Sequence, residues 1–266
     1  MKKLYIIFLI CALGLQSYSQ STTKDRMPVT TSSKSALAFY NEAMKYFEDV
    51  DLTKGRDLLF KSLEEDPDFF MTNYQMSLYY SWMGDFDKFM EYAGAAINCK
   101  ARLSQAEELL KNAMIRLKGD LKSDVTGYGM KLIEMYPGDI NAYNNLFYFQ
   151  SLINDIDGEL ETLNKALKIA GNPAPIYNQM GYVHMSLKQN DKAEAAFDKY
   201  IELDPKNPNV YDSKGDFYMN IRNYRKAYES YMKAYMIDSD WSYEKALKAK
   251  QLYESTEGKR LEIIPM

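Results

Sequence analysis

Apolar residues recur at spacings of three and four from about Ala36 to Glu254, and Gly, Asn, Asp or Pro interrupts the pattern after roughly every 12 to 16 residues. This periodicity is typical of short amphipathic helices joined by tight turns. No stretch shows the convincing alternation of apolar and polar residues that a half-buried β-strand requires. The sequence therefore predicts an all-α fold built from helical hairpins.

The interruptions themselves recur at an almost constant interval. Successive breaks are 34 residues apart, except for one interval of 36, and they fall at Pro67, Ala101, Pro137, Gly171, Pro205 and Ser239. A fixed period of this length over six units indicates a repeat architecture, in which each unit buries its apolar face only against its neighbours.

Small and aromatic residues occupy fixed places inside each unit. They are clearest in two consecutive units, at Tyr177, Met180, Gly181, Ala193, Phe197 and Pro205, and then at Tyr211, Gly215, Tyr218, Ala227, Tyr231 and Ala234. This pattern resembles the tetratricopeptide repeat (TPR), and the chain is similar to an exported bacterial-type member of that family. The resemblance implies a right-handed α-solenoid of about six helix-turn-helix hairpins with a C-terminal capping helix.

The resemblance also implies boundaries for the parts of the chain. We expect a solenoid over residues 36–255, with repeats near 36–69, 70–103, 104–139, 140–173, 174–207 and 208–240, a capping helix at 241–254 and a tail at 256–266. In the third unit Arg116 replaces the aromatic of the family pattern, and in the fourth Phe147 stands where a small residue usually allows close helix contact. A large side chain at such a contact pushes the backbones apart. We therefore expect irregular packing or an altered superhelical pitch in these units.

Local signals mark several helix starts. Asn207 is expected to cap a helix whose first turn contains Pro208, because proline lacks only an N–H that would have no partner there. Pro175 occupies another first turn, and Ser104 with Glu107 forms a capping box.

The N-terminus reads as a segment for export. Residues 1–19 carry two lysines, a short apolar run and small residues near a plausible cleavage point, which is typical of a signal peptide. Residues 20–35 are rich in Ser and Thr and are expected to form a flexible leader. We therefore expect an exported protein, periplasmic or secreted, with no integral membrane segment after cleavage.

Charge and cysteine content narrow the class of partner. Removing residues 1–19 takes away two lysines and no acids, so 31 basic and 37 acidic residues remain, a formal charge of −6. Binding to nucleic acid or to an anionic membrane needs clustered Lys and Arg, so neither is expected.

After cleavage of residues 1–19, Cys99 is the only cysteine, so no disulfide can form within the chain. Packing must then stabilise the fold.

The sequence offers little for catalysis. His184 is the only histidine, no CxxC pair is present, and the chain lacks GxGxxG, GxxxxGK and GxSxG motifs. Residues 155–159 have a passing similarity to a calcium loop but lack its later ligands. We therefore expect no enzymatic activity, no cofactor and no metal site.

In the family that the chain resembles, the first helix of each hairpin lines a concave groove. Carrying those positions over gives a set that is aromatic and amide-rich in the middle and acidic at its C-terminal end: Tyr40, Met44, Tyr74, Leu78, Trp82, Lys111, Met114, Asn144, Asn145, Tyr148, Asn178, Tyr182, Asp212 and Asp216. An amide side chain both donates to and accepts from a peptide bond. The same asparagines are equally explained by hydrogen bonds to neighbouring helices or solvent.

These features favour a non-catalytic scaffold or adaptor at the cell envelope, which binds an extended polypeptide of unknown identity in its concave groove. One alternative is an enzymatic or small-molecule pocket in the third and fourth repeats, near Arg116, Lys118 and Lys131. Another is a structural solenoid that associates with itself through its tail.

Overall fold

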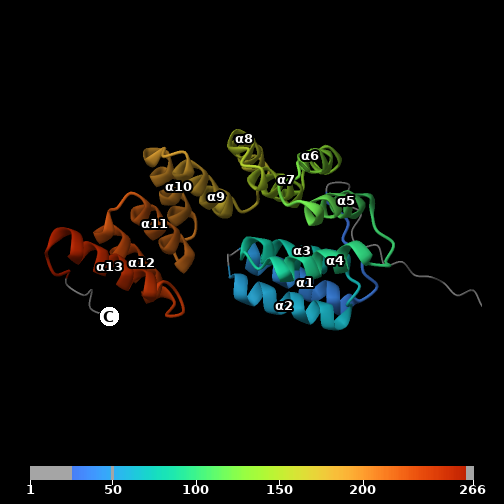
Figure 1. The fold of residues 1–266 in the computed structure, drawn as a ribbon, viewed down its shortest axis with the longest axis horizontal. Coiled ribbons are helices and arrows are strands. Elements are labelled where there is room, and N and C mark those ends of the chain that lie inside the picture. The colour runs from blue at the N-terminus through green and yellow to red at the C-terminus, as the bar shows by residue number, and fades with distance from the viewer. Residues whose placement is uncertain (1–25, 49–50, 262–266) are drawn as a thin grey trace, which may run out of the picture.

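The computed structural model describes residues 26–48 and 51–261. The expected signal peptide at 1–19 lies outside these ranges, as do residues 20–25 of the leader and 262–266 of the tail. Within the described ranges the chain forms 13 α-helices and no β-strand (Figure 1). The prediction of an all-α solenoid is confirmed.

Twelve of the helices form six consecutive pairs, and a single helix follows them. Their bounds are α1 Lys34–Glu48 and α2 Leu52–Glu65, α3 Phe70–Trp82 and α4 Phe86–Asn98, α5 Gln105–Gly119 and α6 Thr126–Met135, α7 Ile140–Leu152 and α8 Ile156–Ala166, α9 Ala174–Ser186 and α10 Asn190–Leu203, α11 Pro208–Asn220 and α12 Tyr224–Ile237, then α13 Tyr243–Glu257. The expected cap at Asn207, the prolines in the first turns of α9 and α11, and the capping box of α5 are all present.

A left-handed backbone residue marks the turn inside four of the pairs. Gly84, Asn154, Lys188 and Arg222 all have a positive φ, between 58° and 73°, and the last three are spaced 34 residues apart. Only Gly adopts this conformation without a steric cost of roughly 1–2 kcal/mol. The turn of the third pair has no residue with positive φ, and α6 after it, with 10 residues, is the shortest of the described helices.

Close helix contact within a pair depends on glycine. A Cβ built on Gly181 would lie 2.6 Å from the ring of Phe197, and one built on Gly215 would overlap the ring of Tyr231 in the same way. Both rings are sixteen residues further along, on the second helix of the same pair. The small and aromatic positions of the repeat are therefore complementary surfaces of one hairpin.

The N-terminal pairs fold back on one another. In Figure 1, α5–α8 lie over α1–α4, and α9–α13 continue away from them. Two contacts join α3 directly to α7: the buried hydroxyl of Tyr74 donates to Asn145 Oδ1 at 2.5 Å, and the Tyr148 hydroxyl donates to Ser81 Oγ at 2.9 Å. The main apolar core accordingly runs from Ala36 to Val183 as one cluster, and smaller clusters lie within α9–α13.

The described part of the leader is anchored on this N-terminal region. Residues 27–31 form no helix, strand or turn. The Met27 N–H donates to Asp139, and the N–H and hydroxyl of Thr30 both donate to Glu107, at 2.7 to 2.8 Å. The Thr31 hydroxyl donates to Asp66 at 2.6 Å. Residues that we expected to be flexible therefore connect the first, third and fourth helix pairs.

At the other end, α13 covers the last pair with the buried Ala246 and Ala249. Leu261 packs against the same C-terminal cluster, and its N–H donates to Glu254 at 3.0 Å. None of the helices in the described ranges is long and apolar enough to cross a membrane.

Candidate ligand-binding pocket

A hollow of about 470 Å³ lies where the N-terminal pairs meet α7 and the start of α9. This volume falls within the usual range for ligand sites. Its lining comes from Arg26 in the leader, the end of α1, the start of α2, the exposed side of α3, the start of α7, and the connection from α8 into α9. It exists because the chain curls, since no single repeat contributes more than part of the wall. We call it the α3–α7 pocket.

The wall formed by α1, α2 and α3 is apolar. It contains Met44, Phe47, Leu78, Tyr79 and Trp82. Trp82 ends α3 at the rim, and its side chain is 69% exposed. An indole this exposed next to a hollow offers a large flat contact area at little entropic cost.

The opposite wall is rich in amides. Asn141, Asn144, Asn145, Asn172 and Gln179 line it, and Gln75 of α3 adds a sixth amide. Asn145 is already engaged, because its Oδ1 accepts from Tyr74 and its Nδ2 donates to the Asn141 carbonyl at 2.7 Å. Asn141 and Asn144 are exposed, so their amides face solvent in the hollow.

Full charges are few in this pocket. Among the described residues that line it, only Arg26 and Glu48 carry one at neutral pH, and their signs are opposite. A bare carboxylate or ammonium group would lose hydration on entering without a dedicated cluster of opposite charge. The lining is therefore suited to uncharged groups that donate and accept hydrogen bonds beside apolar surface.

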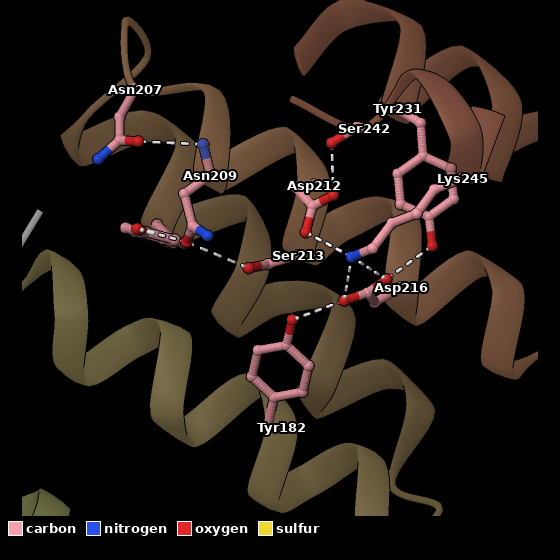
Figure 2. Close-up of polar contacts among 10 residues, drawn as sticks. Tyr182, Asn207, Asn209, Asp212, Ser213, Asp216, Tyr231, Ser242 and Lys245 are labelled. Atoms are coloured by element: carbon pink, nitrogen blue, oxygen red, sulfur yellow. Dashed lines mark hydrogen bonds and ion pairs between the residues drawn. The ribbon is translucent and has the colours of Figure 1, made fainter. Parts of the chain in front are cut away.

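The acidic residues at the C-terminal end of the predicted groove, Asp212 and Asp216, are bound by other side chains of the protein. Figure 2 shows Lys245 of α13 with its ammonium between the carboxylates of Asp212 and Asp216 of α11, at 2.7 and 3.0 Å. Tyr182 and Tyr231 donate their hydroxyls to Asp216, and Ser242 donates to Asp212. The acidic end of the predicted groove is thus filled by the protein's own lysine.

The surroundings of this cluster raise the pKa of Tyr182, Tyr231 and Lys245. Burial raises the pKa of Tyr182 and of Tyr231, and the negative charge of Asp216 raises both further. Burial lowers the pKa of Lys245, but Asp212 and Asp216 outweigh that effect and leave the pKa above its usual value. At neutral pH Lys245 is therefore charged, and both tyrosines are protonated.

The fourteen predicted groove residues fall into distinct environments. Five line the α3–α7 pocket: Met44, Leu78, Trp82, Asn144 and Asn145. Three are buried in the core and closed to a ligand: Tyr40, Tyr74 and Met114. Tyr148 and Tyr182 are half-buried, and their hydroxyls donate hydrogen bonds to other side chains. Asp212 and Asp216 bind Lys245. Lys111 is half-buried outside the pocket, and Asn178 has a buried Oδ1 with no partner in the described chain.

Several residues that line the α3–α7 pocket were not among the predicted groove residues. Gln75 and Tyr79 lie on one face of α3 with Leu78 and Trp82, at spacings of three, four and seven residues, so the helical periodicity alone was sufficient to find them. Arg26, Gly171 and Asn172 gave no such signal, because they reach the pocket only through the curl of the chain.

The enzymatic alternative gains no support from the geometry. Arg116, Lys118 and Lys131 are absent from the lining of the α3–α7 pocket. In the part of the chain that the structure describes, no three His, Cys, Asp or Glu side chains are grouped as metal ligands would be.

Comparison with known proteins supports the repeat assignment. The family model for the tetratricopeptide repeat matches residues 174–207 and 208–240, which hold α9–α10 and α11–α12. A crystal structure of TTC0263, a thermophilic TPR protein of Thermus thermophilus, matches with a TM-score of 0.50 at 20% identity, over 71% of this chain and all of that chain. The crystal structure of YrrB, a TPR protein with an unusual peptide-binding site, matches with a TM-score of 0.37 at 18% identity, over 81% of this chain and 92% of that one.

One curated relative is similar over most of the chain. Superkiller complex protein 3 of Mus musculus is 24% identical over 229 residues, which are 81% of this chain but only 14% of the mouse protein. Residues 174–240 therefore match two tetratricopeptide repeats directly. The described chain as a whole has the fold of an all-α helical-hairpin repeat protein, as TTC0263 does.

Proposed function

We propose that this protein is a non-catalytic scaffold that binds a segment of a partner polypeptide in the α3–α7 pocket. A TPR fold indicates protein-protein interaction, and one observation supports the α3–α7 pocket as the proposed location of that role. Five of the predicted groove residues, including the exposed Trp82 and Asn144, meet around a single hollow of about 470 Å³. Aromatic residues and adaptable amides beside one another are typical of protein-binding surfaces.

The rest of the concave side supports this location by contrast. Lys245 occupies the acidic end, and Tyr40, Tyr74 and Met114 are buried. Of the positions expected to contact a ligand, five line the α3–α7 pocket, and two of these, Trp82 and Asn144, have exposed side chains. A partner that bound at the C-terminal end would have to displace an ion pair first.

Selection of peptides from a displayed library on the purified chain tests this proposal. Peptides that are enriched should lose at least about tenfold in affinity with Trp82→Ala or Asn144→Ala, because central contacts dominate binding energy. Met236→Ala is the matched control, since Met236 is 57% exposed but lies on α12, away from the pocket. Equal binding to the wild-type chain and both pocket variants would contradict the proposal.

We also propose that the protein acts after export, at the cell envelope or beyond. The basis is the sequence of residues 1–19, with its two lysines, apolar run and small residues. Expression of the full chain in a bacterium, followed by fractionation and N-terminal sequencing, tests this. A protein that stays in the cytoplasm with Met1 retained would contradict export.

A further inference from the structure

The leader provides an example, inside this protein, of how its N-terminal helix pairs hold a non-helical segment. Backbone N–H groups of Met27 and Thr30 donate to the side chains of Asp139 and Glu107. The side chains of Met27 and Val29 are partly buried against the main core. Alternate apolar residues thus face the protein while side chains on α5 and at the start of α7 accept hydrogen bonds from the backbone.

The α3–α7 pocket begins where this contact ends. Met27 is bound by Asp139, the residue before Ile140 and Asn141, and both of these line the pocket. Arg26, the residue before Met27, lines it too. The α3–α7 pocket therefore adjoins the surface that residues 27–31 of the leader cover. That surface is occupied by the leader, whereas the pocket is open.

The side chains that bind the leader differ in their hydrogen-bonding capacity from those that line the pocket. The leader is bound by three carboxylates, Asp66, Glu107 and Asp139, which only accept hydrogen bonds when ionised. The pocket instead presents amides, which both donate and accept, so they suit both the N–H and the C=O of a peptide bond. Across from them stand Leu78 and Trp82, which suit apolar side chains.

We infer that the pocket takes an uncharged internal segment of a partner polypeptide, with apolar side chains at alternate positions, laid end to end with the leader. This inference rests on the function proposed above and specifies its ligand. In an extended chain, alternate side chains face the same side, and residues advance about 3.3 Å each. Apolar side chains then contact the α3 wall while the amide wall binds the backbone. A chain terminus would bring a charge that the lining does not match.

Exposed apolar residues continue from the rim in the same direction along the chain. Met83 is the next residue after Trp82, Phe86 begins α4, and Met90 lies one helical turn beyond Phe86; each is 42 to 55% exposed. A cluster of this kind is unusual for a surface without a partner. It offers a place for the next apolar side chain of a segment that passes over Trp82.

Fluorescence of Trp82 measures the inference directly. In the full chain with Trp241→Phe, Trp82 is the only tryptophan. The probe is the capped peptide acetyl-Ser-Leu-Thr-Val-Ser-amide. Its comparison peptides carry Ser in place of Leu and Val, Asp at the hydroxyl positions, or Lys at the hydroxyl positions, and cellobiose represents a saccharide ligand.

The neutral apolar peptide should change the emission of Trp82 with saturation, and each comparison peptide should bind at least about tenfold more weakly. Asn144→Ala should weaken the neutral peptide by a similar factor, whereas Asn112→Ala, an exposed asparagine on α5, should not. No saturation below about 1 mM neutral peptide would overturn the inference, and saturation by cellobiose alone would assign the pocket to another ligand class and overturn it too.

The outcomes separate this inference from the proposed function. Equal affinity for the neutral, Asp and Lys peptides, all lost in Asn144→Ala, would leave a peptide-binding pocket but reject its preference for uncharged segments. Display-selected peptides that ignore Trp82 and Asn144 would instead reject the proposed function itself.

Discussion

The N-terminal and C-terminal parts of this protein use the same repeat position in opposite ways. Asn144, Asn178 and Asp212 are spaced 34 residues apart on α7, α9 and α11. Asn144 is exposed in the α3–α7 pocket, the Oδ1 of Asn178 is buried without a partner in the described chain, and Asp212 is buried and bound by Lys245 and Ser242. One periodic position therefore gives an open, an unsatisfied and a filled site in turn.

The cause lies in what faces each position. In α1–α8 the leader and the cross-contact of α3 with α7 fix the backbone, and a hollow remains between them. In α9–α13, helix α13 supplies Lys245, a long cation that fills the equivalent space beside α11 (Figure 2). The period of the repeat sets where a side chain lies, and non-periodic neighbours decide whether it can contact a ligand. The comparison can be tested from both ends of the molecule.

Alkaline pH should destabilise both parts and gives the largest expected effect. Burial raises the pKa of Tyr40 and Tyr74 in the N-terminal part, as it does for Tyr182 and Tyr231 in the C-terminal part. Because the folded pKa lies above the unfolded value near 10.0, stability is complete below pH 10 and is lost as pH rises beyond it. At about pH 11 each such tyrosine should cost roughly 1 kcal/mol, so the total is several kcal/mol.

Urea unfolding at about pH 9 and about pH 11 measures this loss, with tyrosinate absorbance followed in parallel. If the two parts are comparable, both should weaken together. Complete tyrosinate absorbance, from all 23 tyrosines, with the helices still folded would contradict the burial of these hydroxyls.

Removing the leader's main acceptor should weaken the N-terminal part alone. Glu107 is fully buried and accepts hydrogen bonds from Thr30 N–H, Thr30 Oγ and Ser104 N–H. Glu107→Ala leaves three half-buried donors without their acceptor and should lower the free energy of unfolding by about 3 kcal/mol. Hydrogen exchange should increase in α1, α5 and α7 and stay unchanged in α11 and α12.

Glu108→Ala is the control, because Glu108 is the exposed neighbour of Glu107 on the same turn of α5. It should change the free energy of unfolding by no more than about 0.5 kcal/mol. Equal effects of the two substitutions would mean that the leader contributes nothing to stability.

Removing the lysine that fills the acidic end should weaken the C-terminal part less. Lys245 is 47% exposed, so solvent screens its pairs with Asp212 and Asp216. Lys245→Met should cost about 1 kcal/mol and speed hydrogen exchange in α13 only. Lys248→Met, an exposed lysine on the same helix, should have no effect, and matching exchange in both variants would show that the ion pairs do not hold α13.

Much of the fold could be predicted from the sequence because the same local pattern of residues recurs in each repeat. The 34-residue period, the glycine-aromatic contact at Gly181 and Gly215 and the cap at Asn207 are local, and each follows from spacing within one or two helices. The irregular packing or altered pitch expected where Arg116 and Phe147 break the pattern stays a prediction.

The candidate site was only partly predictable, because it depends on how far the chain curls. Tyr74 and Asn145, 71 residues apart, meet through the contact of α3 with α7, and no spacing within a repeat indicates such a pair. The Ser/Thr-rich composition of the leader favoured flexibility, whereas buried Glu107 binds Thr30. Lys245 filling the acidic end is likewise a contact between helices, with 33 residues separating it from Asp212.

Asn178 is the position where the comparison gives the smallest and most informative change. Its Oδ1 is buried and accepts no hydrogen bond from the described residues, so this amide costs stability that its own contacts do not return. Asn178→Ala should therefore leave the free energy of unfolding within about 0.5 kcal/mol of wild type or raise it. Asn145→Ala is the matched control and should lower it by about 1–2 kcal/mol, because the buried hydroxyl of Tyr74 loses its acceptor.

Chemical denaturation of the two variants side by side measures the difference. A loss for Asn178→Ala as large as for Asn145→Ala would show that its Oδ1 has a partner in solution, and the position would then belong with the filled site at Asp212. No loss, together with weaker binding of the neutral peptide, would group Asn178 with Asn144, because the amide would then serve a ligand at a cost to the empty protein.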